Sequence, residues 1–174
     1  MQHYMRKVEE SANFLKNAGL VKPRIGILTG TGLGAIGQSL VTTDEFSYQQ
    51  LPHFPVSTVA SHRGRLLMGT FYDKPAVVLQ GRFHLYEGYT PQEVTFPIRV
   101  MQVLGIEFLI VTNAAGGLNQ DFNPGDIMII TDHINLTGAN PLIGPNNDNW
   151  GNRFPDMSRA YDHNLSDLAR KAAE

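Results

Sequence analysis

Apolar residues recur along the chain at two spacings, which predict helices and strands. Helical spacing is seen in the apolar residues of the first stretch, which are Val8, Ala12, Leu15 and Ala18. Gly19 follows them as a helix stop. The same spacing returns near the end of the sequence in Tyr161, Leu165, Leu168, Ala169 and Ala172. We therefore expect an amphipathic helix in each of these two stretches.

A third helix is predicted from its start signal. Residues 90–93 read Thr-Pro-Gln-Glu, a capping box with proline at the first helical position. The helix should run to Leu104, where Gly105 ends it, and Pro97 should loosen its early turns.

Short apolar runs predict five strands, at residues 24–28, 65–72, 76–79, 108–112 and 127–131. Residues 135–155 are rich in Asn, Gly and Pro and read as a loop. Strands thus alternate with helices, which predicts an α/β fold with a mostly parallel, mixed central sheet flanked by helices. In such sheets ligands bind at the carboxyl ends of strands.

Composition narrows the class of protein. The chain has 174 residues, so we expect one domain spanning 1–174. Its 14 Lys and Arg nearly balance 16 Asp and Glu, which argues against a nucleic-acid or membrane-surface binder. It has no cysteine, hence no disulfide or thiolate metal site, and its first residues do not form a secretory signal. A cytoplasmic protein is the expectation.

Three predicted strands end in residues suited to binding an anion. The first leads into the glycine turn 30–34, whose backbone N–H groups and Thr31 hydroxyl can donate to phosphate. The second leads to Arg82, His84 and Glu87, where arginine is the natural partner of a phosphate and Glu87 can orient a neighbouring cation. The third leads into the small residues 113–117. Convergence of these ends at one edge of the sheet would make a site.

Each motif also has a plainer interpretation. The glycine turn alone reads more readily as a tight strand-to-helix connection that binds nothing. Residues 32–37 also fit the G-x-G-x-x-G pattern of dinucleotide enzymes, but no acidic residue follows about 20 positions on. His62 alone reads as a solvated loop histidine, and we assign His133 and Asp132 no role because no partner stands at metal-ligand spacing.

Six segments together resemble the trimeric purine nucleoside phosphorylases. They are 30–34 (GTGLG), 61–66 (SHRGRL), 80–89 (QGRFHLYEGY), 111–118 (VTNAAGGL), 125–128 (GDIM) with 132–135 (DHIN), and 153–158 (RFPDMS). The resemblance spans almost the whole chain, and the segment 81–89 is its most specific part.

The resemblance implies a role for individual residues. The phosphate-binding set it implies is Thr31, His62, Arg82, Phe83, His84 and Ala114. His84 and Glu87 are the implied catalytic residues. Tyr86 corresponds to a ribose contact, and Phe154 to an aromatic residue that reaches a neighbouring subunit's sugar pocket. No metal or organic cofactor is implied, since inorganic phosphate is a co-substrate.

The implied reaction is reversible phosphorolysis of a purine nucleoside to the free base and ribose or deoxyribose 1-phosphate. Its partners are the nucleoside and phosphate, and a homotrimer is expected. Members of this family are usually longer, and their base-recognising residues lie beyond the equivalent of position 174. We therefore expect the N-terminal portion of the enzyme, with an incomplete sheet, the phosphate site and part of the ribose site.

Rival functions stay open at this point. A hydrolytic nucleosidase would use water and a carboxylate or metal in place of an anion clamp. Methylthioadenosine phosphorylase is a closer relative, although residues 84–89 resemble the purine nucleoside enzymes better. An NAD-dependent oxidoreductase rests on the glycine pattern only. The chain could also be an inactive module that only binds phosphate or oligomerises.

Overall fold

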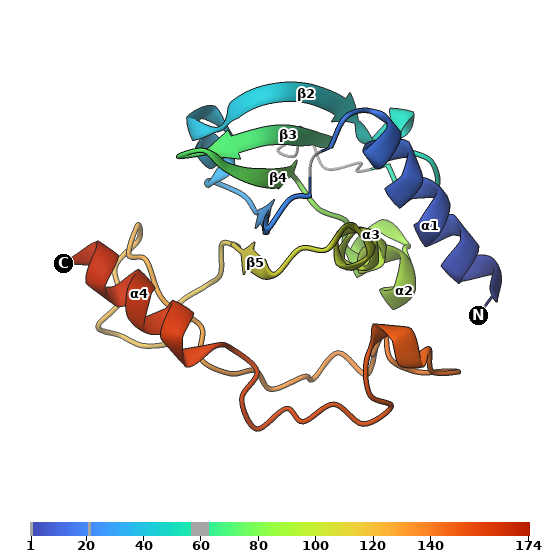
Figure 1. Cartoon of the computed structure of the whole chain (residues 1–174). Helices are drawn as coiled ribbons and strands as arrows, with labels where there is room; N and C mark the ends of the chain where they lie inside the picture. The colour runs from blue at the N-terminus through green and yellow to red at the C-terminus, as the bar shows by residue number, and fades with distance from the viewer. Residues whose placement is uncertain (1, 21, 57–62) are drawn as a thin grey trace. The chain divides into compact units, whose positions relative to one another are not determined.

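The computed structural model describes residues 2–20, 22–56 and 63–174. They fall into two compact units, drawn in Figure 1. The first contains the chain up to Ala114 together with Asn140–Pro145, and the second contains Ala115–Ala139 and Asn146–Glu174. Each unit is described by itself below.

The elements follow in the order α1 (Gln2–Asn17), β1 (Ile25–Thr29), η1 (Gly34–Ser39), β2 (Val41–Ser47), η2 (Tyr48–Gln50), β3 (Arg65–Phe71), β4 (Lys74–Gln80), η3 (Leu85–Glu87), α2 (Pro91–Val94), α3 (Phe96–Leu104), β5 (Phe108–Val111), η4 (Asp148–Trp150) and α4 (His163–Ala173). The elements marked η are 3₁₀ helices.

The first unit is built on one mixed sheet, with strand order β2-β3-β4-β1-β5. β2, β3 and β4 pair antiparallel, whereas β1 pairs parallel with β4 on one side and with β5 on the other. The mixed sheet of an α/β fold is thus confirmed, and its parallel part is the side that contains β1. The three strands on this side, β4, β1 and β5, are those whose ends the sequence predicts to form a binding site.

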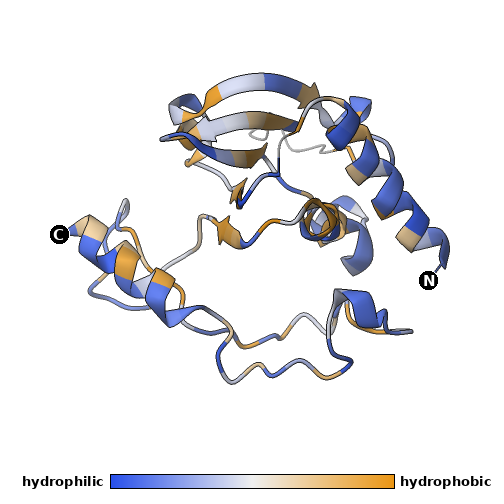
Figure 2. Ribbon diagram, viewed as in Figure 1, coloured by the Kyte–Doolittle hydropathy of each residue, from blue (hydrophilic) through white to orange (hydrophobic). Residues whose placement is uncertain are grey.

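Both faces of the sheet are covered over β1, β3 and β4, whereas the side chains of β5 are 38–51% exposed. On one face, Ile27, Leu67 and Val78 belong to a buried cluster, which is completed by η1 and by Leu40 between η1 and β2. On the other face, α3 packs against β1 so closely that a Cβ at Gly26 would lie 2.9 Å from Met101 Sδ. Helix α1 lies beside α3 and buries the residues predicted from its spacing, Val8, Ala12 and Leu15 (Figures 1 and 2).

The predicted helix after residue 90 is present but broken. Thr90 caps α2, accepting from the Glu93 N–H while the Glu93 carboxylate accepts from the Thr90 N–H. Thr95 then leaves the helical region with φ −93° and ψ 0°, and α3 begins at Phe96. Pro97 explains the break, because it supplies no N–H for the helical ladder and its ring crowds the preceding turn.

Strand β2 was not expected from the sequence. Its residues, VTTDEFS, are mostly polar, and the burial pattern shows that the side chains of its first three positions are exposed. An edge strand of a sheet needs few buried side chains, since its pairing with β3 comes from main-chain hydrogen bonds. The apolar periodicity that predicts strands is therefore absent here.

The second unit consists mainly of irregular segments. The strand predicted at 127–131 is wrong: the segment pairs with no strand among the described residues, and Ile127 is 91% exposed. The predicted last helix is confirmed as α4, where Asp162 caps the start by accepting from the Leu165 N–H. Figure 2 shows apolar positions along α4 in orange, and the side chains there are exposed, Leu165 at 38% and Leu168 at 60%.

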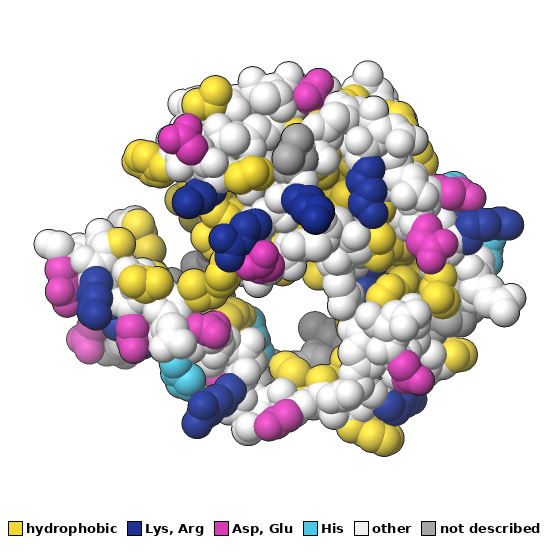
Figure 3. Space-filling view, viewed as in Figure 1, with side chains coloured by type: hydrophobic (Ala, Val, Ile, Leu, Met, Phe, Trp, Pro, Cys, Tyr) yellow, Lys and Arg dark blue, Asp and Glu magenta, His cyan; other side chains and the backbone are white. Residues whose placement is uncertain are grey.

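On the face drawn in Figure 3, several Lys and Arg side chains form a loose row, with Asp and Glu side chains beside the row and near the rim. None of the described helices combines the length and the apolar content that crossing a membrane requires.

The buried cluster beside η1 should contribute to the free energy of unfolding, and this can be tested. Leu67→Ala removes a side chain that is 3% exposed, so the free energy of unfolding should fall by about 2–5 kcal/mol. Val41→Ala, in β2 of the same sheet, truncates a side chain that is 70% exposed and should change it by less than about 0.5 kcal/mol. Urea unfolding of both variants checks this, and equal effects would contradict the assigned core.

Candidate functional site

The carboxyl ends of β4, β1 and β5 meet at one edge of the sheet, as the sequence predicted. Thr29 at the end of β1 is the register partner of Gln80 at the end of β4. On the other side of β1, the Thr112 N–H donates to the Leu28 carbonyl at 2.9 Å. The Gly30 N–H in turn donates to Thr112 Oγ1 at 3.0 Å. These bonds join the start of the glycine turn to the segment that follows β5.

Glycine is required at the start of this turn. A Cβ at Gly30 would lie 2.6 Å from the Thr112 carbonyl oxygen and 2.8 Å from Asn113 Cα. Gly32 has φ +86°, a backbone conformation that residues other than glycine rarely adopt. The turn is therefore shaped by the neighbouring strand end.

The helix expected after the glycine turn is a 3₁₀ helix, η1, of six residues. Its sequence, GAIGQS, has two glycines and little tendency to extend into a longer α-helix. A helix this short offers a weak dipole. Anion binding at this turn must therefore come from individual N–H groups and from cationic side chains nearby.

A small cavity of about 60 Å³ opens beside the turn. It is lined by Thr29, Gly30, Gly32, Gly34, Arg63, Gln80 and Gly81. The predicted Thr31 does not line it and is exposed. Sequence reasoning had assigned no role to Arg63 or Gln80. The pattern that could have identified Gln80 is its position as a polar residue directly after the apolar run AVVL.

The predicted cluster of Arg82, His84 and Glu87 is assembled in the structure. The carboxylate of Glu87, whose side chain is 1% exposed, accepts from the His84 N–H at 2.9 Å and from Nδ1 at 2.6 Å. The 3₁₀ turn η3 makes this geometry, and Gly88 ends it with φ +91°. Glu87 thus fixes the orientation of the imidazole.

Arg82 joins this cluster to the end of β5. Its Nη1 donates to the Thr112 carbonyl at 3.1 Å, and its Nε donates to His84 Nε2 at 3.4 Å. Since Nε2 accepts this bond, it carries no proton, and the ring proton of the neutral imidazole sits on Nδ1 facing Glu87. The cluster presents one guanidinium and one oriented imidazole.

The neighbouring aromatic residues differ in exposure. Tyr86 is 75% exposed, and its ring stacks on the His84 ring at 4.5 Å between centroids. Phe83 is 2% exposed and packs against Tyr48, at 5.0 Å between centroids. Its side chain belongs to the core, so a contact between Phe83 and an anion would have to use the main chain. Burial also raises the pKa of Tyr48, whose hydroxyl donates to the Gly81 carbonyl.

Ala114 and Phe154, like Thr31, are not brought into this cluster by the described contacts. His62 lies outside the described residues. Ala114 is exposed at the end of the first unit, two residues after Thr112. Phe154 belongs to the second unit and is 86% exposed. Across residues 2–20, 22–56 and 63–174, no three or more His, Cys, Asp or Glu side chains are grouped so as to hold a metal ion.

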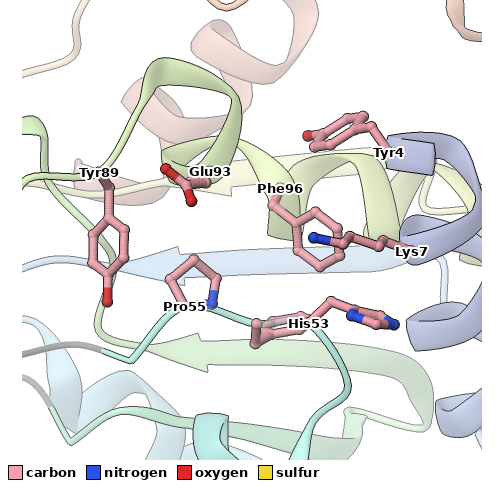
Figure 4. A pocket seen from close by; sticks show the side chains of 8 residues that line it. Tyr4, Lys7, His53, Pro55, Tyr89, Glu93 and Phe96 are labelled. Atoms are coloured by element: carbon pink, nitrogen blue, oxygen red, sulfur yellow. The ribbon is translucent and has the colours of Figure 1, made fainter. Parts of the chain in front are cut away.

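A larger cavity of about 220 Å³ lies elsewhere in the first unit (Figure 4). It is lined by Tyr4, Lys7, His53, Phe54, Pro55, Tyr89, Glu93 and Phe96. None of the predicted site residues lines it. The carboxylate in its lining, that of Glu93, already caps α2. The hydrogen bond from the Thr90 N–H holds the pKa of Glu93 below its usual range. We therefore take the strand-end cluster as the candidate site.

Comparison with known proteins identifies the family of the chain. A model of the phosphorylase superfamily matches residues 24–174. Purine nucleoside phosphorylase 1 of Bacillus subtilis is 52% identical over 168 residues, covering 97% of this chain and 62% of that protein. Purine nucleoside phosphorylase of Bos taurus is 48% identical over 164 residues, covering 92% of this chain and 57% of that protein.

Solved structures give the same result. Isoform 2 of purine nucleoside phosphorylase from Schistosoma mansoni, in complex with cytosine and ribose-1-phosphate, superposes with a TM-score of 0.89 at 43% identity. The match covers 97% of this chain and 60% of that one. The chain thus spans less than two thirds of the length of the relatives it matches.

The Glu87–His84 geometry makes a spectroscopic prediction. At about pH 8.5, where an ordinary imidazole is neutral, His84 should carry its proton on Nδ1 in the wild-type chain. Glu87→Ala removes the acceptor of that proton, so the His84 ring nitrogens should shift toward a mixture of both tautomers. Two-bond ¹H–¹⁵N correlation spectra measure this.

The control is Glu107→Ala, which removes an exposed carboxylate paired with Arg24. It should leave the His84 signals unchanged. Unchanged His84 signals in Glu87→Ala as well would contradict the role of Glu87 in orienting the ring.

Proposed function

Because the chain belongs to the phosphorylase superfamily, we propose that it carries the phosphate-binding half of a purine nucleoside phosphorylase site. The observation that supports this most directly is the Arg82–His84–Glu87 cluster beside the glycine turn. The whole protein's reaction is the reversible phosphorolysis of purine ribo- and deoxyribonucleosides, which makes it a pentosyltransferase of nucleoside salvage.

Phosphate binds, in this proposal, between the glycine turn and the cluster. The N–H groups of the turn donate to the anion, and the exposed Thr31 hydroxyl adds a further donor. The Arg82 guanidinium exchanges its long bond to His84 for a shorter, charge-assisted bond to phosphate. Once Arg82 has turned to the anion, His84 binds phosphate as a protonated ring: Nε2–H donates to a phosphate oxygen while Nδ1–H donates to Glu87 on the other side.

The reaction follows from this placement. The bond between C1′ of the sugar and N9 of the base lengthens first, so positive charge develops on the sugar. The bound phosphate dianion stabilises that charge from the opposite side and then bonds to C1′ with inversion, while the base leaves with the bond's electron pair. Holding phosphate and nucleoside together removes much of the entropic cost of their encounter. Tyr86, exposed beside His84, contacts the ribose.

The proposal uses no metal and no organic cofactor, since phosphate itself is the nucleophile. The proposal places the protein in the cytoplasm. The absence of cysteine and the small net charge of −2 are compatible with that compartment. The partners are the nucleoside and phosphate. Neither a nucleic acid nor a membrane surface is among them.

The first experiment measures release of hypoxanthine from inosine with and without inorganic phosphate. Release that depends on phosphate is expected of the whole enzyme, whereas release in water alone would identify a hydrolase. Phosphate binding without any turnover, even when the remaining two fifths of a relative's sequence are supplied, would favour the second function, a non-catalytic phosphate-binding module.

Arg82 supplies the sharpest test of the phosphate site. Arg82→Ala should weaken the binding of inorganic phosphate by about 10- to 100-fold, the range for hydrogen bonds to charged groups. Arg99→Ala removes the same charge from α3, where Arg99 donates to Gln102, and should leave the affinity unchanged. Calorimetric titration at fixed ionic strength measures both. Equal affinities in the two variants would remove Arg82 from the site.

We further propose a homotrimer in which the exposed Phe154 of one subunit completes the sugar pocket of its neighbour. Phe154→Ala and Arg82→Ala should each abolish most phosphorolysis. Mixed trimers of the two variants, however, contain sites with both residues intact. Activity should therefore reappear on mixing and subunit exchange, up to about one quarter of the wild-type rate for random mixing. No recovery in mixtures that are trimeric by sedimentation would contradict a shared site.

A further inference from the structure

Gln80, the last residue of β4, has a polar side chain that is almost completely buried, at 2% exposure. Both ends of its amide are hydrogen-bonded. Nε2 donates to the Gly34 carbonyl at 2.7 Å, and Oε1 accepts from Arg65 Nε at 2.6 Å. A buried amide that is hydrogen-bonded at both ends fixes the position of the groups it joins. Here those groups are a strand end and the last residue of the glycine turn.

We infer that Gln80 is a positioning residue that fixes the glycine turn, and through it the affinity of the phosphate site. The inference rests on the proposed function, because the turn is one wall of that site. Gln80 acts through the carbonyl of Gly34, whose position determines where the N–H groups of the turn point.

The support for Gln80 extends across the sheet. Arg65 is its register partner on β3, and the Nη1 of Arg65 donates to the Glu45 carboxylate on β2 at 2.6 Å. Exposure of these side chains rises outward, from Gln80 through Arg65 at 25% to Glu45 at 49%. The three side chains form a chain of hydrogen bonds from an edge strand to the turn. Its exposed end contributes little, whereas its buried end is costly to break.

The amide group is chemically specific. It must donate to a carbonyl and accept from a guanidinium at the same time. A carboxylate would keep the bond to Arg65 but cannot donate to Gly34, and a methionine could do neither. Either change leaves the Gly34 carbonyl without its donor in a buried place.

Gly37 in η1 provides a second observation for the same arrangement. A Cβ at Gly37 would lie 2.2 Å from Gln80 Nε2 and 2.9 Å from its Cδ. No side chain can therefore occur at position 37 while the amide keeps its place. Gly37→Ala should displace the amide although it changes neither Gln80 nor a residue of the phosphate site.

The test compares two variants of this arrangement with one control. Gln80→Glu and Gly37→Ala should each weaken the binding of inorganic phosphate by about 3- to 10-fold, the range for one hydrogen bond. Val78→Ala, also on β4 and fully buried, removes packing but no hydrogen bond. It should lower the melting temperature without changing phosphate affinity. Wild-type affinity in Gln80→Glu would overturn the inference.

A second measurement needs no phosphate. In ¹H–¹⁵N spectra, the amide signals of Gly30, Gly32 and Gly34 should move in Gln80→Glu and in Gly37→Ala but stay in place in Val78→Ala. Unmoved signals in the first two variants would overturn the inference even if the wild-type chain bound no phosphate. Moved signals together with a wild-type chain that does not bind phosphate would instead refute the proposed function.

Discussion

The parallel pairing of β1 with β4 and β5 is the constraint on which the rest of the structure depends. It brings the ends of three strands that are far apart in the sequence to one edge of the sheet. Thr112 then bonds to both Leu28 and Gly30, and its carbonyl accepts from Arg82. The glycine turn and the Arg82 cluster are thereby held against a common main-chain segment. Any anion bound there would contact groups from all three strand ends.

Much of the fold could be predicted because apolar runs favour strands, both where the side chains are buried, as in β4, and where they are exposed, as in β5. The runs that became β1, β3, β4 and β5 are short, apolar and bounded by turn residues. β2 has no such run. As an edge strand it is stabilised by main-chain hydrogen bonds, which do not require apolar side chains. The error at 127–131 has the opposite cause: apolar residues favour a strand only when another strand is available to pair with them.

The candidate site was predictable where its contacts are local. His84 and Glu87 are three residues apart, so one 3₁₀ turn brings them together. Gln80 contacts Arg65 across 15 residues and Gly34 across 46, and these contacts depend on strand register and on the position of η1. Periodicity does not determine either quantity. The sequence thus marks polar residues at strand ends, but only the structure shows which groups a residue such as Gln80 contacts.

The strand order also has a consequence for how the chain folds. β1 is the first strand in the sequence, but its neighbours in the sheet are residues 76–80 and 108–111. The antiparallel pair β3–β4, joined by a two-residue turn, can close early because its loop is short, whereas β1 must wait for partners about 50 and 80 residues away. During synthesis on a ribosome, the glycine turn therefore emerges long before the strands that shape it. Contact order therefore predicts that the hairpin folds before β1 pairs, and that the strand-end cluster forms later.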